Sequence, residues 1–323
     1  MTRSRWSLLL LALVVSCLIA TAVGTIPLSL AQLLRAMTGE GDALTVHVLR
    51  SLRLPRVSLA VLVGAGLGMS GAALQGSMRN ALAEPYLLGV SGGAAVGAVT
   101  AVSIGAGASV IPLAAFLGAV VAVIVAFFVA HASGARGDPK ALLMAGVVVG
   151  AFANALIMIA LANAEANTVR GALWWMMGSV ADATWAQNAW LAAYIAVGGG
   201  LLVFVARRID ILTLGEDAAA GLGLDVDRSA RLIYLLSAFV AASTVAAAGL
   251  VGFVGLITPH IVRRLGARTH RPLLVGSAIA GAALVVMSDL VARVLRPPAE
   301  LPLGAVTAVI GVPFFLAQLR RFT

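Results

Sequence analysis

Long apolar stretches recur along almost the whole chain, and the short gaps between them hold most of its charges. Apolar residues (AVILMFWYC) make up 61% of the 323 residues and charged residues 11%, against about 45–50% (with glycine) and about 25% in soluble domains. Because no water-soluble core can hide this surplus, the bilayer must be the solvent for much of the chain. We predict an all-α integral membrane protein with about ten spanning helices and one domain, residues 1–323. The predicted spans are Trp6–Leu30, Val57–Met78, Leu87–Ser103, Val110–Ala132, Ala141–Asn163, Ala189–Ala206, Ser229–Ala248, Leu250–Leu265, Leu273–Leu295 and Leu303–Leu319.

The basic residues predict the orientation of these spans, because cytoplasmic loops carry an excess of Lys and Arg. If the N-terminus is cytoplasmic, alternate gaps hold all but seven of the 22 basic residues. This split predicts that both termini are cytoplasmic. The seven on the outer side are Arg35, Arg50, Arg53, Arg56, Arg170, Arg293 and Arg296. Most of these seven cluster in residues 35–56 and 293–296, and clusters on the less favoured side indicate an additional role.

Two stretches depart from a plain spanning helix. The eighth is short and contains Gly252, Gly255 and Pro259, which predicts a broken or half-depth helix. Such a helix is tolerated only where protein or a water-filled cavity covers its freed backbone groups. The first contains the only cysteine, Cys17, in a sequence that loosely resembles a lipoprotein cleavage box. Its length favours an uncleaved spanning helix over a signal peptide.

The sequence lacks the residue patterns that ATP binding, metal binding, enzymatic catalysis and nucleic-acid binding require. The phosphate loop GxxxxGK[ST] is absent and the only lysine, Lys140, stands in GDPK, so any ATP must be bound by another chain. The four histidines have no histidine or cysteine at ligand spacing, so we expect neither a metal nor a cofactor. The sequence contains no nucleophile–base pair of the kind that would indicate an enzyme. The net charge of +9 comes from single residues and pairs at the ends of apolar runs, which is not the basic face of a nucleic-acid binder.

A few residues remain as candidates for function. Asp289 lies inside a predicted span, where a carboxylate is a functional candidate by default. The plainer explanation is an i,i+4 pair with Arg293 near the outer surface. The outer loop holds a run of large side chains that could form an interfacial belt or line the mouth of a pathway. This run is Trp174, Trp175, Met176 and Met177.

The predicted cytoplasmic segment at residues 212–227 contains a short helix. Glu216 and Asp217 suit its N-terminus, and Gly221 and Gly223 then end it. A short amphipathic helix along the membrane could dock into a groove of a soluble partner. A simple loop helix explains the same pattern, and the residues alone do not separate the two.

Four groups of motifs, taken in order from about Arg50 to the C-terminus, resemble one family. They are Leu52–Arg56 with Gly64–Gly71 and Gln75, then Arg79–Ala94, then Leu214–Gly223, then Gly252–Arg263 with Pro298–Gly304. The chain resembles the permease subunits of type II ABC importers, which carry iron–siderophore complexes, haem or cobalamin. Each motif is weak alone, and the ordered set is specific. Two departures occur, Ala81 in place of the family's proline and Ser91-Gly92-Gly93-Ala94 in place of Ser-Ser-Gly-Ala.

The resemblance implies ten helices in a lipid-embedded homodimer, with two cytoplasmic ATPase subunits and an external, periplasmic binding protein. It also implies that Arg53, Arg56 and Arg293 receive acidic side chains of that binding protein. A segment that couples the permease to the ATPase is implied as well. Its residues are Leu214, Gly215, Glu216, Asp217, Ala218, Ala219, Ala220, Gly221, Leu222 and Gly223.

We therefore expect a non-enzymatic permease subunit in the bacterial cytoplasmic (inner) membrane. The expected cargo is an iron chelate, siderophore or haem, because iron chelates are the commoner cargo of such proteins, and cobalamin is the alternative. A secondary carrier or channel that works without ATP is a rival from another class. An intramembrane enzyme would need polar side chains clustered at one depth, and the sequence does not show them.

Overall fold

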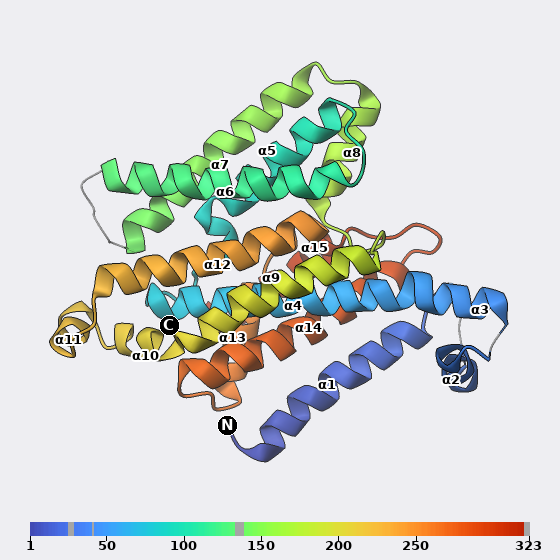
Figure 1. Cartoon of the computed structure of the whole chain (residues 1–323), viewed down its shortest axis with the longest axis horizontal. Helices are drawn as coiled ribbons and strands as arrows, with labels where there is room; N and C mark the ends of the chain where they lie inside the picture. Colours follow the sequence, from blue (N-terminus) through green and yellow to red (C-terminus); the bar gives the residue numbers. More distant parts are fainter. Residues whose placement is uncertain (25–28, 41, 133–138, 320–323) are drawn as a thin grey trace.

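The computed structural model describes residues 1–24, 29–40, 42–132 and 139–319, and every regular element in these ranges is helical (Figure 1). The prediction of an all-α protein is therefore confirmed. The predicted cytoplasmic C-terminus at residues 320–323 lies outside the described ranges. The elements are α1 (Arg3–Ala22), α2 (Leu30–Thr38), α3 (Ala43–His47), η1 (Val48–Arg53), α4 (Leu54–Ser77), η2 (Pro85–Leu88), α5 (Val90–Ser103), α6 (Val110–Ala132), α7 (Pro139–Ala162), α8 (Ala166–Met177), α9 (Trp185–Phe204), α10 (Ala206–Leu212), α11 (Glu216–Gly221), α12 (Val226–Ala248), α13 (Val254–Arg264), α14 (His270–Val294) and α15 (Leu303–Leu319).

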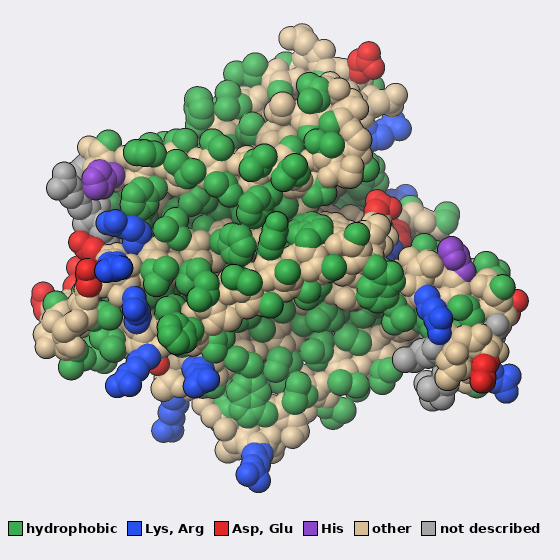
Figure 2. Space-filling view, in the orientation of Figure 1, with side chains coloured by type: hydrophobic (Ala, Val, Ile, Leu, Met, Phe, Trp, Pro, Cys, Tyr) green, Lys and Arg blue, Asp and Glu red, His purple; other side chains and the backbone are tan. Residues whose placement is uncertain are grey.

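Seven helices of the described ranges are long and apolar enough to cross a membrane. They are α1, the continuous helix Ala43–Ser77, α6, α7 from Ala141, α9, α12 and α14. The third, eighth and tenth predicted spans correspond to the shorter helices α5, α13 and α15, so a count of ten full spans is not confirmed. Figure 2 shows apolar side chains over the middle of the molecule and most charged ones toward its two ends.

The first two predicted spans have wrong bounds for identifiable reasons. Helix α1 ends at Ala22 rather than Leu30, and the side chain of Ser29 then caps α2 by accepting a hydrogen bond from the backbone of Gln32. Serine is a favoured N-cap residue because its oxygen satisfies a free amide of the first turn. The second span begins at Ala43 instead of Val57, because the helix continues through the π-helical turn η1. The arginines of that turn lower the local hydropathy, so the hydropathy pattern did not predict this part of the helix.

Helices α4 and α14 form the centre of the bundle and pack with their backbones in contact. A Cβ atom built on Gly64 would lie 2.1 Å from the carbonyl oxygen of Gly281, and one on Gly68 would lie 2.1 Å from that of Ser277. Small residues at i,i+4 spacing allow such close approach in lipid, where no hydrophobic force drives helices together. Gly64 and Gly68, four residues apart, therefore form the packing surface for α14.

The remaining long helices divide into two groups in Figure 1. Helices α5, α6, α7 and α8 form the upper group, and α1, α9, α13 and α14 surround α4 in the lower group. Helix α12 lies at the boundary, where Tyr234 and Val245 share a buried cluster with Val90 of α5 and Ala119 of α6. The outward faces of the upper group expose large apolar side chains, as a bilayer or a protein partner requires.

The short helix α13 begins inside the bundle, and two side chains support its start. Before α13, the amide of Val251 donates to the hydroxyl oxygen of Tyr86 and the amide of Phe253 donates to a carboxylate oxygen of Glu84, both at 2.7 Å. Glu84 and Tyr86 lie in the segment that leads into α5. The predicted break in the eighth span is therefore confirmed, and protein groups satisfy its free amides as the bilayer demands.

Candidate functional site

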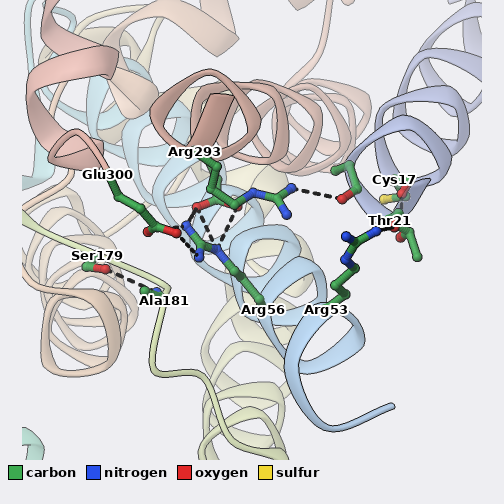
Figure 3. A network of polar contacts seen from close by, with 10 residues as sticks. Cys17, Thr21, Arg53, Arg56, Ser179, Ala181, Arg293 and Glu300 are labelled. Carbon is green, nitrogen blue, oxygen red and sulfur yellow. Dashed lines mark hydrogen bonds and ion pairs between the residues drawn. The ribbon is translucent and has the colours of Figure 1, made fainter. Parts of the chain in front are cut away.

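The outer-loop arginines of the prediction gather at one end of the bundle, which we call the α3 end (right in Figure 1; Figure 3). Arg56 of α4 binds two carboxylates at once. Its Nη2 lies 2.8 Å from Asp289 Oδ1 of α14, and its Nη1 and Nη2 lie 2.8 Å from the two carboxylate oxygens of Glu300. Its Nε also donates to both oxygens of Asp289 at 3.1 Å. Paired, charge-assisted hydrogen bonds of this kind are among the strongest in proteins.

Arg53 and Arg293 extend this network to the C-terminal end of α1. Arg53 Nη1 donates to the carbonyl oxygens of Thr21 and Ala22 at 2.7 and 3.0 Å. Arg293 Nη2 donates to the carbonyl oxygen of Ala20 at 2.8 Å, and its Nε lies 3.3 Å from Asp289. Cationic side chains at a helix C-terminus satisfy free carbonyls and complement the helix dipole. The predicted Asp289–Arg293 pair is therefore present, but the main partner of Asp289 is Arg56.

The side chains of this network differ in how much of their surface is exposed to solvent. The side chains of Arg56, Arg293 and Asp289 are 11%, 9% and 3% exposed, whereas that of Glu300 is 41% exposed. Hydrogen bonding to Arg56 lowers the pKa of Glu300 below its ordinary value, so this carboxylate stays charged at neutral pH. Glu300 is thus the accessible edge of a network whose arginines are already paired. The sequence motif included Glu300 but assigned it no role.

The predicted coupling segment projects from the opposite end of the molecule, which we call the α11 end (left in Figure 1). It consists of the last turn after α10, the short helix α11 and the two residues that follow. Leu214 and Leu222 are 62% and 64% exposed, while Ala219 is fully buried and anchors the segment. Two exposed leucines that flank a short helix with an acidic first turn form a surface suited to a partner protein.

An ion pair attaches this segment to the bundle, a histidine–carboxylate hydrogen bond attaches α10, and sequence reasoning missed both. Arg79, which follows α4 with a positive φ of 50°, pairs with Glu216 at the start of α11. Asp210 of α10 accepts a hydrogen bond from the backbone amide of His270 at 2.8 Å, and its carboxylate lies 2.7 Å from His270 Nδ1. His270 is the first residue of α14. Partners 137 and 60 residues apart leave no periodic signal in a sequence.

A cavity of about 940 Å³ opens near the α3 end, between α8, the start of α9 and the end of α12. Trp174, Trp175 and Trp190 line it, together with the carboxylates of Asp182 and Glu300. Its volume is typical of small-molecule sites. Two of the four side chains predicted at a pathway mouth therefore line a cavity, whereas Met176 and Met177 are not among its lining residues.

No group of three or more His, Cys, Asp and Glu side chains that could hold a metal ion occurs in the part of the chain that the structure describes. Cys17, the single cysteine, is a half-buried free thiol on α1. Within the described residues, the fold brings charged side chains together in the arginine network at the α3 end and in the Arg79–Glu216 ion pair at the α11 end, where Asp210 also binds His270.

Comparison with known proteins gives these features a common context. The profile of the FecCD transport family matches residues 11–321. The chain is 40% identical over 277 residues to the cobalamin import system permease protein of Halobacterium salinarum, covering 84% of this chain and 73% of that one. It is 33% identical over 320 residues to the iron(3+)-hydroxamate import system permease of Bacillus subtilis, covering 96% and 95%.

A solved structure agrees with the sequence comparison. An inward-facing metal-chelate-type ABC transporter superposes with a TM-score of 0.88 at 29% identity, covering 97% of each chain. The agreement includes the short and broken helices, since almost the whole chain is matched. The family resemblance predicted from the motifs is therefore confirmed. This multi-pass membrane protein belongs to the FecCD transport family and is an ABC importer permease.

Proposed function

We propose that this chain is the permease subunit of an importer that moves a metal chelate across the bacterial cytoplasmic membrane by alternating access. It works as a homodimer with two ATPase subunits on one side and an external binding protein on the other. The observation that carries the proposal is the division of the molecule into two unlike ends. One end presents a short helix flanked by exposed leucines, and the other holds a cluster of arginines and carboxylates.

The α11 end faces the cytoplasm in this proposal, and residues 214–223 contact the ATPase. The exposed Leu214 and Leu222 give the segment an apolar surface, and the buried Ala219 fixes the segment to the bundle. A segment anchored on one face and apolar on the other can transmit a displacement of its partner. The orientation agrees with the excess of basic residues on this side.

The α3 end faces outward and receives the binding protein, with Arg53, Arg56 and Arg293 as the docking residues. Their partners within this chain define how docking works. Arg53 and Arg293 hold the end of α1 through its carbonyl oxygens, and Arg56 is covered by Glu300. An acidic side chain of the binding protein therefore reaches Arg56 by displacing Glu300, the most exposed member of the network.

The cargo is a metal chelate, and relatives of this chain carry names of two cargo classes. The iron chelate predicted from the sequence, siderophore or haem, is supported by the relatives named for iron(3+)-hydroxamate and iron(3+)-citrate import. Cobalamin is the second candidate, because the 40% identical relative is named a cobalamin import permease. The aromatic cavity beside Trp174 and Trp175 offers planar surfaces to either class.

Reconstitution of the transporter tests the proposal. The chain, with an ATPase and a binding protein encoded beside it, is placed in proteoliposomes, and uptake of a ferric siderophore, haem and cobalamin is measured. We expect uptake that requires ATP and the binding protein. Uphill uptake by the chain alone would instead establish the rival secondary carrier.

A variant of the coupling segment tests that residue assignment. Ala220→Trp places a bulky side chain on the exposed face of α11 and leaves the buried Ala219 in place. We expect uptake to fall while ATP hydrolysis continues. Gly200→Ala, at a position with no neighbouring atom within 4 Å, serves as the control. Normal coupled uptake by Ala220→Trp would remove the role of the segment.

A further inference from the structure

The coupling segment and α10 are tied to two particular helices of the bundle. Arg79, at the end of α4, pairs with Glu216 of α11, and His270, at the start of α14, pairs with Asp210 of α10. The Asp210 carboxylate also accepts the first amide of α14, so it holds that helix by its backbone as well as by a side chain. Both attachments therefore lie at the α11 ends of α4 and α14.

The imidazole of His270 brings these two helices together at the same end. It lies so close to Gly76 of α4 that a Cβ atom there would fall 2.3 Å from its Nε2, and 2.5 Å from Cγ2 of Ile209 in α10. The missing side chain at Gly76 thus leaves the space in which His270 and α10 pack against α4. The last turn of α4, the first turn of α14 and α10 form one packed junction.

From this junction the two helices run together to the other end of the molecule. The backbone contacts at Gly68 with Ser277 and at Gly64 with Gly281 lie along their length, and Arg56 binds Asp289 near the far end. Helix α14 has 25 residues and is about 37 Å long, enough to cross the hydrocarbon core. Backbones in contact leave little room for sliding, because any shift brings carbonyl groups into collision.

Helix α12 is the competing route, since it follows the coupling segment directly along the chain. It is attached to α4 by a hydrogen bond from Ser70 Oγ to the carbonyl oxygen of Ser237, at 2.8 Å. Its far end leads to Gly249 and the segment before α13, whereas the far ends of α4 and α14 carry the arginine network. The α4–α14 pair joins the contacts of Arg79 and His270 at one end directly to the arginine network at the other.

We infer that α4 and α14 move as one rigid body that carries displacement of the coupling segment to the arginine network, with Arg79, Glu216, Asp210 and His270 as the positioning residues. The inference rests on the proposed function, which supplies the displacement. Coupling between distant sites requires an element with two arrangements that both sites bias. The alternating access of the proposed function supplies the two arrangements, and the attachments at both ends of the helix pair connect it to both sites.

The test follows the outer end of α14 while the residues at its inner end are changed. A spin label on Leu295→Cys, an exposed position just after α14, is introduced into the Cys17→Ala background. The complex with its ATPase is placed in nanodiscs, and the distance between the two labels of the homodimer is measured with and without ATP. ATP hydrolysis is recorded in parallel, which shows that each complex is assembled.

The two informative single variants leave residues 214–223 intact. Arg79→Gln and Asp210→Asn each remove one attachment, and Arg207→Gln, on the exposed face of α10, is the matched control. We expect ATP to shift the label distance in the wild type and in the control. The shifted population should fall about two- to fivefold in each variant, the equilibrium effect of losing an ion pair of modest strength. The swap Arg79→Glu with Glu216→Arg should recover most of it.

Two results would contradict the inference in different ways. A wild-type complex without any ATP-dependent shift would remove the proposed function and the inference with it. A wild-type shift that persists unchanged in both single variants, or a swap that recovers nothing after both singles fail, would overturn the inference alone. The displacement would then have to pass through another helix, with α12 and α9 as the candidates, since α9 leads directly into α10.

Discussion

At the scale of single residues, Arg56 shows why charge alone does not describe the proposed docking site. Its guanidinium group is bound by Asp289 and by Glu300, and only Glu300 is substantially exposed. An acidic partner therefore competes with a carboxylate that already belongs to this chain. Electrostatic complementarity across an interface then depends on how readily the internal carboxylate leaves.

This competition predicts that removing the charge of Glu300 increases the affinity for the binding protein. Glu300→Gln should tighten docking of the binding protein by about two- to fivefold, because the competing ion pair is gone while Asp289 still neutralises Arg56. Titration calorimetry or interferometry with the permease in nanodiscs measures the Kd. Glu165→Gln makes the same charge change at another exposed position just before α8 and should leave the Kd unchanged. Weaker docking by Glu300→Gln would show that Glu300 itself contacts the binding protein.

The sequence predicted part of this site. The unusual arginines at 53, 56 and 293 and the spacing of Asp289 to Arg293 identified most members of the network. The Arg56–Glu300 contact joins residues 244 apart, and nothing periodic marks it. Glu216 belonged to the predicted coupling segment, but its bond to Arg79 depends on how α4 ends against α11.

At the scale of elements, glycine determines which helices can be neighbours. Gly64 and Gly68 stand at the i,i+4 spacing that favours tight helix packing in lipid, but this spacing does not specify the partner helix. The structure shows that Gly64 meets Gly281 and Gly68 meets Ser277. Complementary small residues occur on many helices of this chain, so the pairing is set by the tertiary fold rather than by either helix alone.

A methyl group at this contact should be costly. Gly281→Ala places its Cβ atom 2.1 Å from the carbonyl oxygen of Gly64, so the helices must separate. We expect destabilisation of at least about 1–3 kcal/mol, the usual cost of overpacking. Thermal unfolding in detergent, followed by fluorescence, measures the change. Gly200→Ala has open space and should be neutral or stabilising, since alanine is the better helix former by about 1 kcal/mol. An unchanged melting temperature for Gly281→Ala would mean that the two backbones are farther apart.

Short elements account for the largest difference between prediction and structure. Hydropathy marks how much of the chain lies in an apolar environment, not how much of it is helical. Helices α5 and α13 have 14 and 11 residues, and the apolar residues before them are extended or turned inside the bundle. The glycines and proline of the eighth stretch revealed one break. The supporting contacts of Glu84 and Tyr86 come from a distant segment and were not predictable.

At the scale of the whole molecule, the two ends differ in chemistry, and the proposed function requires them to face opposite compartments. Leu222, in the coupling segment, is 64% exposed, and Ile104, which follows α5 near the cavity, is 76% exposed. Neither side chain contributes to a buried core, so each position accepts a reporter. The single native cysteine is easily removed from the background.

Labelling from each side of the membrane checks this orientation. With Cys17→Ala, a membrane-impermeant maleimide should modify Leu222→Cys only in inside-out vesicles and Ile104→Cys only in right-side-out cells, because the charged reagent does not cross lipid. Denatured samples, in which both cysteines react, provide the control. Modification of both positions from the same side would exclude the proposed arrangement of ATPase and binding protein.

The supported break before α13 also has a consequence for biosynthesis. Tyr86 and Glu84 leave the ribosome 165 and 169 residues ahead of the amides they will bind. At about 5–20 residues per second, the delay is on the order of ten seconds. The early helices must therefore enter the bilayer before the carboxylate of Glu84 and the phenol of Tyr86 have formed their hydrogen bonds. Membrane insertion and final assembly of this chain are separate events, and the second cannot finish until translation is nearly complete.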